Sequence, residues 1–273
     1  MNTQTSQGTA LVTGASSGIG SVYADRLAHR GYDLILAGRD TARLESLAAK
    51  LRGPGRKVAI VAGDFGKKAD VKEIEQRLLT DPAITLFVNN AGQAAVTPLI
   101  ESDVEKLEQM IEVNVVAFTR LAAAAAKAFV QRGRGTIINI SSAVALAPEM
   151  LNSAYNASKA YVLNFTQSMQ NELAGKGVQV QAVLPGAVGT ELWARSGLPV
   201  EHLPKEIVMP VEAAVDAALA GLDQGELVTI PSLPDVENWD SYVAARKVLR
   251  PNLSLAQPAA RYRRPASPAP RRP

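Results

Sequence analysis

The feature that most constrains this chain is an alternation of short apolar runs with longer helical patterns, repeated from residue 9 to about residue 231. The runs are rich in valine, isoleucine and leucine without regular polar alternation, which predicts strands covered by helices on both faces. They read "TALVT", "DLILAG", "KVAIVAG", "ITLFVNNAG", "GTIINISS", "VQVQAVLPG" and "ELVTIP". The alternation predicts an α/β fold, a Rossmann-like doubly wound parallel sheet of about seven strands with helices on both faces.

The segments between these strands have the three- and four-residue apolar spacing of helices, with Thr41 and Ser102 as expected N-caps. No linker-like change of composition precedes residue 251, so we expect a single domain over residues 1–250. Its last helix is expected from Val236 to Leu249. Residues 251–273 are rich in proline and arginine, and this composition predicts a flexible tail.

The composition is that of an ordinary globular protein, with 47% hydrophobic and 20% charged residues over 273 positions. The absence of cysteine excludes disulfides and thiolate catalysis, and with His29 and His202 as the two histidines we expect no metal site. The first residues lack the features of a signal peptide, and the run "LAAAAAKAFV" is too short and too charged to span a membrane. We expect a cytoplasmic protein without a membrane partner.

The positive net charge of +3 is concentrated at the C-terminus. The segment "RYRRPASPAPRRP" holds five arginines and no acid, and without it the chain is slightly acidic. A nucleic-acid-binding protein usually carries a basic face on its folded part. We therefore expect a solvated basic tail and no nucleic-acid partner.

A glycine-rich segment, "TGASSGIG", lies between the first strand and the first helix, where such folds bind phosphate. Its spacing is G-x-x-x-G-x-G rather than G-x-G-x-x-G. The same letters contain G-x-S-x-G, the nucleophile pattern of serine hydrolases, with Ser16 as the nucleophile. A hydrolase would need a later acid and histidine, and His202 is the one candidate, so this alternative is weak.

The segment "NSAYNASKAYV" places Tyr155 and Lys159 one helical turn apart. A phenol has a pKa of about 10, and a neighbouring cation stabilises its anion and lowers that value. The pair could be a usable proton donor or an ordinary feature of a helix surface. Its meaning depends on the rest of the chain.

Together these segments resemble the short-chain dehydrogenase/reductase family in its single-domain form. The glycine turn, "NNAG" at 89–92, Asn114, Ser142, the Y-x-x-x-K pair and "PGAVGT" at 185–190 match the family's motifs in order. The resemblance covers about residues 8–231 and implies an NAD(P)-dependent oxidoreductase that transfers hydride between the cofactor and a carbonyl or secondary alcohol.

The resemblance implies a role for each catalytic candidate. Tyr155 would be the general acid and base, and Ser142 would bind the carbonyl oxygen. Lys159 would lower the pKa of Tyr155 and bind the nicotinamide ribose. Asn114 would hold a water in a proton relay.

The resemblance also implies the cofactor site. Gly38 stands where NAD-selective members carry an acid, and Arg39 follows, which favours NADP(H) because a guanidinium pairs well with a 2′-phosphate. Asp40 keeps NAD(H) open. The expected cofactor-binding residues are Gly14, Ser16, Ser17, Gly18, Ile19, Gly20, Arg39, Asp64, Phe65, Asn90, Ala91, Gly92, Tyr155, Lys159, Pro185, Gly186, Val188 and Thr190.

Substrate selection is expected to come from a lid at about 190–210 and from the loop after Ser142. Leu146, Met150, Leu192 and Trp193 predict an apolar wall, suited to an uncharged ketone, alcohol or 3-oxoacyl group. Family members of this kind assemble as homotetramers or dimers through the helices expected at about 103–132 and 152–175. A non-catalytic cofactor-binding sensor is the alternative, although all four catalytic candidates are present.

Overall fold

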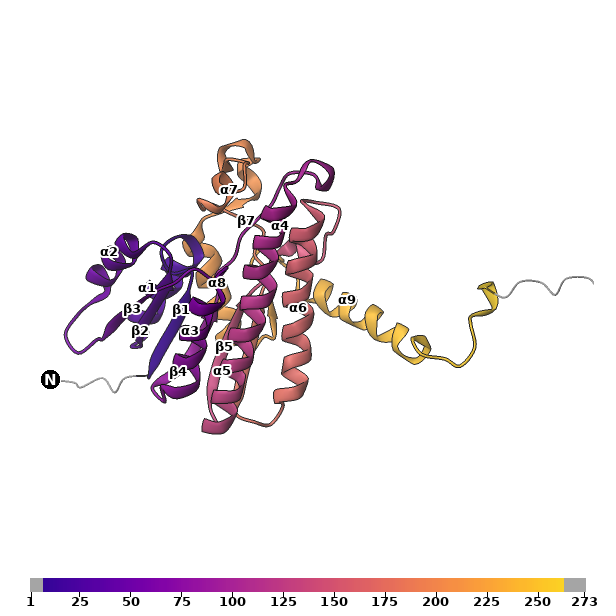
Figure 1. The fold of residues 1–273 in the computed structure, drawn as a ribbon. Helices are drawn as coiled ribbons and strands as arrows, with labels where there is room; N and C mark the ends of the chain where they lie inside the picture. The colour runs from indigo at the N-terminus through magenta and orange to yellow at the C-terminus, as the bar shows by residue number, and fades with distance from the viewer. Residues whose placement is uncertain (1–6, 263–273) are drawn as a thin grey trace, which may run out of the picture. The chain divides into compact units, whose positions relative to one another are not determined.

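A parallel sheet forms the centre of the computed structural model, which describes residues 7–262 (Figure 1). Its seven strands lie in the order β3-β2-β1-β4-β5-β6-β9. All neighbours pair in parallel, and the order turns back between β1 and β4. The strands are β1 (Thr9–Thr13), β2 (Asp33–Gly38), β3 (Val58–Ala62), β4 (Ile84–Asn89), β5 (Gly135–Ile140), β6 (Val178–Val183) and β9 (Val228–Thr229). The predicted doubly wound fold is confirmed.

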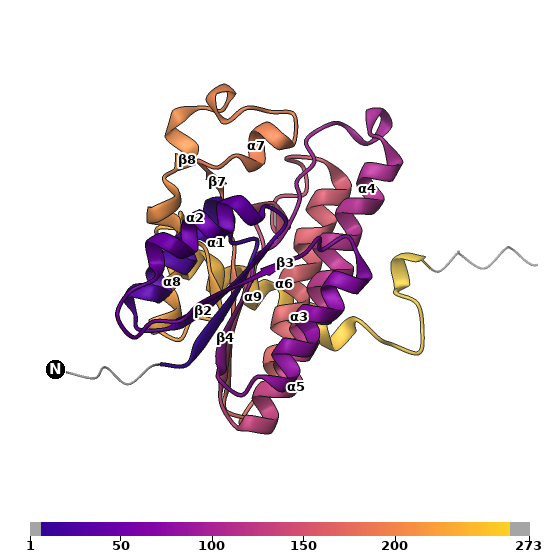
Figure 2. The same ribbon diagram turned by 60° about the vertical axis from the view of Figure 1, so that its left-hand side comes forward.

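Helices cover both faces of the sheet (Figure 2). One face packs against α1 (Gly18–His29), α2 (Thr41–Leu51) and α8 (Val211–Asp223), and the other packs against α3 (Lys68–Thr80), α5 (Phe118–Arg132) and α6 (Ser153–Leu173). Each face has its own apolar core, centred on Leu36 and Leu44 on one side and on Phe87 and Phe129 on the other. The strands are therefore buried on both faces, which explains their continuous apolar sequences.

The long helical region before β5 is one continuous stretch with an irregular middle. It consists of α4 (Val104–Ile111), a π-helical segment (Glu112–Ala117) and α5. By length and composition the stretch Val104–Arg132 could cross a membrane, but 56% of its most apolar window is buried inside the protein. It is a core helix, and the π-helical segment that contains Asn114 is of the kind often found at functional sites.

Two of the expected N-caps are wrong by one residue. Asp40, not Thr41, caps α2 by accepting a hydrogen bond from the Arg43 amide at 3.0 Å. Asp103, not Ser102, caps α4. In both places an aspartate adjoins a hydroxyl residue, and either side chain can cap a helix, so the sequence alone did not separate them.

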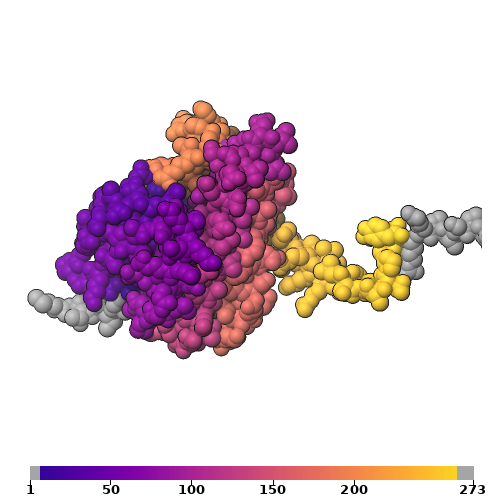
Figure 3. All heavy atoms as spheres, viewed as in Figure 1, coloured from indigo at the N-terminus to yellow at the C-terminus, as the bar shows by residue number. Residues whose placement is uncertain are grey.

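A lid follows β6 at the carboxyl end of the sheet. The short strands β7 (Ala187–Val188) and β8 (Val208–Met209) pair in parallel and enclose a loop with one short helix, α7 (Leu192–Arg195). Two 3₁₀ turns (Val200–His202 and Lys205–Ile207) complete this loop. Figure 3 shows the lid in orange at the upper edge of the domain. It lies in the segment expected at about 190–210.

The described residues divide into two compact units, one ending at Ser232 and the other beginning at Leu233. The first unit contains the sheet and the lid. The second contains α9 (Val236–Leu249), with the bounds expected from the sequence, and no residue of this helix is buried. Residues 263–273 of the Pro/Arg-rich tail lie outside the described residues.

Candidate active site

The glycine-rich turn between β1 and α1 has a backbone that side chains would disrupt. Gly14 and Gly18 have positive φ angles of 66° and 56°, a region that favours glycine. Gly20 has an ordinary φ, but a Cβ there would collide with the Gly14 carbonyl oxygen. The turn therefore brings bare backbone and the N-terminus of α1 to one surface, which is the arrangement that binds phosphate in such folds.

A buried threonine fixes this turn to the neighbouring strand. Thr13 Oγ1 donates to the Val88 carbonyl at 3.2 Å and accepts from the amides of Asn90 at 2.9 Å and Ala91 at 3.1 Å. The Asn90 side chain in turn donates to the Thr13 carbonyl at 2.8 Å. These bonds join the ends of β1 and β4, and Asn90 and Ala91 line the same crevice as the glycine turn.

Tyr155 lies in the first turn of α6, and its position is set by the helix cap. The Asn152 side chain accepts from the amides of Ala154 at 2.9 Å and Tyr155 at 3.3 Å. The phenol is buried and hydrogen-bonds the Ser142 hydroxyl, which comes from the end of β5. Burial raises the pKa of Tyr155 to about 12, and the bond to Ser142 opposes part of this shift.

Lys159 lies one turn further along α6 and is also buried. Its Nζ donates to the Ile140 carbonyl at 3.0 Å and lies 5.9 Å from the centre of the Tyr155 ring. Burial lowers the pKa of Lys159 to about 8. In the protein alone, burial therefore has the largest effect on both pKa values. The sequence predicted that Lys159 would lower the pKa of Tyr155, and this is wrong for the protein without ligand, in which that pKa is raised.

Asn114 lies in the π-helical segment, beside the turn that follows β4. Its Oδ1 accepts from the Gln93 amide at 2.8 Å, and its Nδ2 donates to the Gln93 carbonyl at 2.8 Å and to Ser158 Oγ at 3.1 Å. The side-chain amide thus fixes the backbone at Gln93 next to the catalytic candidates. Its expected role as a water holder stays a prediction.

Most of the expected site residues line one cavity of about 820 Å³ at the carboxyl end of the sheet. Three do not. Gly20 lies under the turn, Asn114 lies behind Gln93, and Leu146 follows the 3₁₀ turn after Ser142 without reaching the cavity. The others that line it are Gly14, Ser16, Ser17, Gly18, Ile19, Arg39, Asp64, Phe65, Asn90, Ala91, Gly92, Ser142, Met150, Tyr155, Lys159, Pro185, Gly186, Val188, Thr190, Leu192 and Trp193.

The cavity also has lining residues that the sequence did not single out. They are apolar side chains from two segments and a smaller number of polar ones. They include Val144, Leu151, Leu203, Ile207, Met209, Ser141, Glu206 and Ser232. The lid residues among them belong to or directly follow 3₁₀ turns and strands of two or three residues, which are too short for a periodic pattern to show the inward face. The lining thus has more apolar residues than predicted, and it also includes the charged Arg195 and Glu206.

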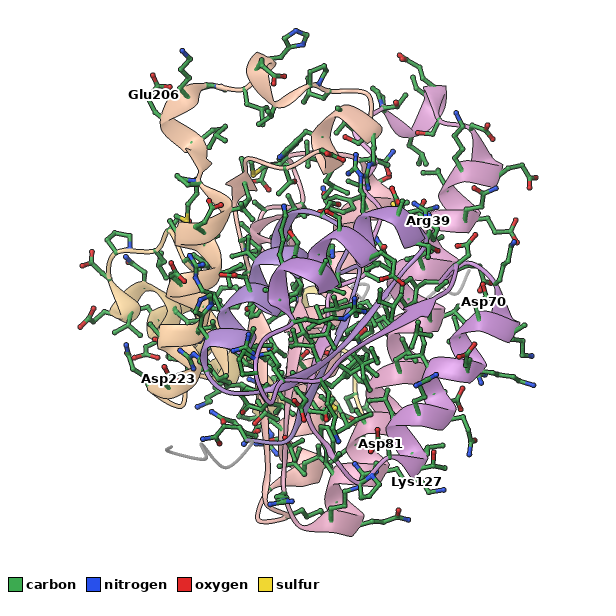
Figure 4. All side chains as sticks on the ribbon, turned by 90° about the vertical axis from the view of Figure 1, so that its left-hand side faces the viewer. Arg39, Asp70, Asp81, Lys127, Glu206 and Asp223 are labelled. Atoms are coloured by element: carbon green, nitrogen blue, oxygen red, sulfur yellow. The ribbon has the colours of Figure 1, made fainter. Side chains whose placement is uncertain are left out.

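Two neighbours at the end of β2 have different environments. Arg39 is exposed and lines the cavity at its rim. Figure 4 shows it toward the end of the sheet that carries the lid and Glu206, whereas Asp81 and Lys127 lie toward the other end. Asp40 is occupied as the cap of α2, and its carboxylate also lies 3.3 Å from Arg43 Nε. The structure gives Asp40 a local helix-capping role and leaves Arg39 facing the rim.

The serine-hydrolase alternative finds no support in the site. Ser16 lines the cavity beside Gly38, where its Oγ lies 3.6 Å from the position that a Cβ on that glycine would take. His202 is in a turn of the lid and is absent from the cavity lining. Within residues 7–262, no group of three or more His, Asp or Glu side chains is arranged to hold a metal ion.

Comparison with known proteins identifies the family. Residues 8–199 match the family model for short chain dehydrogenases, and the chain belongs to this family. It is an NAD(P)-dependent oxidoreductase. Among characterised relatives, a diacetyl reductase [(S)-acetoin forming] of Staphylococcus epidermidis is 35% identical over 189 residues, which are 68% of this chain and 74% of the relative.

Two solved structures are similar over nearly the whole chain. A short-chain dehydrogenase of Sphingobium yanoikuyae in complex with NADPH is 47% identical with a TM-score of 0.91, covering 94% of this chain and 100% of that one. A bulky-bulky ketone specific alcohol dehydrogenase of Comamonas testosteroni is 40% identical with a TM-score of 0.87, covering 94% and 99%. Both match the fold described above.

Proposed function

We propose that this protein is an NADP(H)-dependent carbonyl reductase and alcohol dehydrogenase for ketones with hydrophobic substituents. The observation that carries the proposal is the buried Ser142–Tyr155 pair, which opens with Lys159 into the same cavity as the glycine turn. A proton donor and a phosphate-binding turn in one cavity suit reversible hydride transfer to a carbonyl.

The residues of the crevice fit a dinucleotide. The bare glycine backbone would accept the pyrophosphate, and the tied Asn90–Ala91 segment would face the adenosine ribose. Arg39 would bind the 2′-phosphate, since its exposed guanidinium has no side-chain partner among the described residues while Asp40 caps α2. The preference for NADP(H) over NAD(H) rests on this difference. When bound, the nicotinamide supplies or accepts the hydride.

The protein's own residues would handle the proton. Ser142 would hold the carbonyl oxygen, and Tyr155 would pass its phenolic proton to that oxygen as negative charge develops there. With its pKa raised by burial, Tyr155 is protonated at neutral pH and ready to act as the acid in reduction. Lys159 would donate hydrogen bonds from Nζ to the ribose hydroxyls. Its positive charge would then lie near the phenol of Tyr155.

The substrate side of the cavity favours uncharged, apolar ketones. Leu192, Trp193, Ile207 and Met209 of the lid line it, as do Met150 and Leu151. The Comamonas relative is named for bulky-bulky ketones, and the Staphylococcus relative is named for diacetyl. The large apolar wall here supports the former type of substrate.

Assembly and location also remain proposals. Exposed apolar side chains on the α4–α6 side, Ile111, Val116 and Tyr161, support a homotetramer or dimer formed through these helices. The absence of cysteine suits the cytoplasm.

The test is a panel of ketones that runs from diacetyl to ketones with two bulky apolar groups, with NADPH and NADH and the nicotinamide absorbance as readout. We expect turnover with NADPH on the bulky members. Arg39→Ala should weaken NADPH binding at least tenfold more than NADH binding, while Arg52→Ala, which removes an exposed arginine directly after α2, should change neither. An equal loss for both cofactors in Arg39→Ala, or no turnover of any ketone, would contradict the proposal.

A further inference from the structure

The lid is held loosely compared with the rest of its unit. No residue from 189 to 210 is buried, and α7 and both 3₁₀ turns have no buried side chain. At its base the lid is fixed by the β7–β8 pairing and by the Trp193 indole, which donates to the Val188 carbonyl at 2.9 Å. A segment with so few buried contacts opens at low cost in free energy unless something else restrains it.

One ion cluster provides that restraint. Glu191 Oε2 accepts from Arg43 Nη1 at 2.6 Å and from Arg195 Nη2 at 2.6 Å. Arg195 belongs to the lid itself, whereas Arg43 belongs to α2. Residues 191–207 lie in the part of the lid between its two short strands. In the part of the chain that the structure describes, the Glu191–Arg43 pair is the one side-chain hydrogen bond or ion pair that joins these residues to the domain beyond the lid, which spans 187–209.

The Glu191–Arg43 bond connects two walls of the cofactor cavity. Arg39 and Asp40 line the cavity on the α2 side, and Arg43 is one turn away, aligned by the Asp40 cap and by its contact with the Asp40 carboxylate. On the lid side Thr190 and Leu192, the two neighbours of Glu191, line the same cavity. The bond therefore closes the rim between the expected 2′-phosphate end and the lid.

The ion cluster is exposed to solvent, and two arginines share one carboxylate oxygen of Glu191. Each of the three side chains is about half exposed, so the interaction is screened by salt. Because two guanidiniums share one carboxylate oxygen, they hold the pKa of Glu191 below its ordinary value. Glu191 is thus ionised throughout the neutral pH range, and the bond responds to ionic strength rather than to pH.

We propose that Glu191 is a positioning residue that ties the lid across the cofactor cavity to Arg43, and that opening this tie limits the release of the dinucleotide. The proposal rests on the proposed function for the identity of the ligand. The residues themselves touch neither the hydride-transfer centre nor the phenol of Tyr155. Their effect is expected on cofactor residence and lid motion, not on the chemical step.

The test measures NADPH dissociation by stopped-flow fluorescence with excess NADP⁺ as the displacing ligand. Glu191→Gln should release NADPH about two- to fivefold faster than the parent protein at low salt, and Arg43→Met should do the same. The double variant should be no faster than either single one, because all three remove the same bond. Raising salt should speed release in the parent protein and have less effect in Glu191→Gln.

The matched control is Glu45→Gln. Glu45 of α2 makes an exposed pair with Arg52, the residue after this helix, and neither residue lines the cavity. This variant should release NADPH at the parent rate and keep the parent salt dependence. A parent-like rate and salt dependence in Glu191→Gln would overturn the proposal.

Hydrogen exchange in the cofactor-free protein separates this proposal from the proposed function. In Glu191→Gln the amides of 191–207 should exchange faster than in the parent, while those of β5 should be unchanged. Equal exchange in the lid would overturn the tie even if NADPH binds. Failure of NADPH to bind would instead contradict the proposed function and leave the exchange result to decide the tie.

Discussion

The two halves of the cavity are built by different means. On the β1–β4–α6 side, Thr13, Asn90 and Asn114 each join a backbone turn to a second segment, and Asn152 caps α6, through bonds of 2.8 to 3.3 Å. On the lid side no residue from 189 to 210 is buried. The difference implies that the geometry around Tyr155 and Lys159 is set before any ligand binds, whereas the lid surface can adapt to a ligand.

The largest expected effect is on the chemistry of the rigid half. Tyr155→Phe should reduce the rate of carbonyl reduction at least about a hundredfold, because the proton donor is lost, while NADPH affinity is kept. Rapid-mixing measurement of NADPH oxidation gives the rate, and fluorescence titration gives the affinity. Tyr161→Phe is the control, since its phenol pairs with Thr119 Oγ1 at 2.8 Å on the outer side of α6. Parent-like reduction by Tyr155→Phe would remove this tyrosine from the mechanism.

The next effect concerns the free energy of unfolding and its dependence on pH. Lys159 has a pKa of about 8 when folded and an ordinary value of 10.5, so between these values the unfolded chain binds more protons. The free energy of unfolding should therefore rise with pH, by about 2 kcal/mol between pH 7.5 and 9.5. Urea unfolding at several pH values should show this rise in the free energy of unfolding for the parent protein and not for Lys159→Met. Parallel pH profiles for the two proteins would contradict the burial of a titrating lysine.

A smaller effect is expected from the threonine that fixes the glycine turn. Thr13→Val keeps the shape but leaves the amides of Asn90 and Ala91 without their acceptor, which should cost about 2 kcal/mol of stability. Chemical unfolding measures the loss, and NADPH binding should weaken with it. Thr80→Val, at an exposed helix position where the hydroxyl bonds the Gln76 carbonyl, should cost far less. Equal losses would mean that the Thr13 bonds do not hold the turn.

The smallest effect is expected in the lid. Trp193→Phe removes the indole bond to Val188, yet the free energy of global unfolding should change by less than about 0.5 kcal/mol, because the lid opens before the domain unfolds. The KM for bulky ketones should change instead, since Trp193 lines the cavity. A loss of stability like that of Thr13→Val would show that the lid is part of the cooperative core.

The contrast between the halves also decided what the sequence could predict. Continuous Val/Ile/Leu runs predicted the strands, because a sheet buried on both faces accepts little else. Glycine at positions 14 and 18 predicted the turn, since its backbone requires positive φ angles. Tyr155 and Lys159 were found by their one-turn spacing together with the family resemblance. Each of these signals is local.

What the sequence could not predict depends on contacts between distant segments. Leu146 was expected in the cavity wall and lies outside it, while Leu203 and Met209 were missed. The raised pKa of Tyr155 reflects burial by the whole fold, which the Tyr–Lys spacing does not reveal. The bond between Glu191 and Arg43 joins residues 148 positions apart, and no periodic pattern marks either residue.

The division into a preformed half and a loosely held lid can be tested directly by hydrogen exchange without and with NADPH. In the cofactor-free protein, amides of β4, β5 and the first turns of α6 should exchange only through global unfolding, and those of 191–207 should exchange much faster. NADPH should slow the lid and leave β5 nearly unchanged. Lid amides as slow as those of β5 without NADPH, or rapid exchange around Tyr155, would contradict the account.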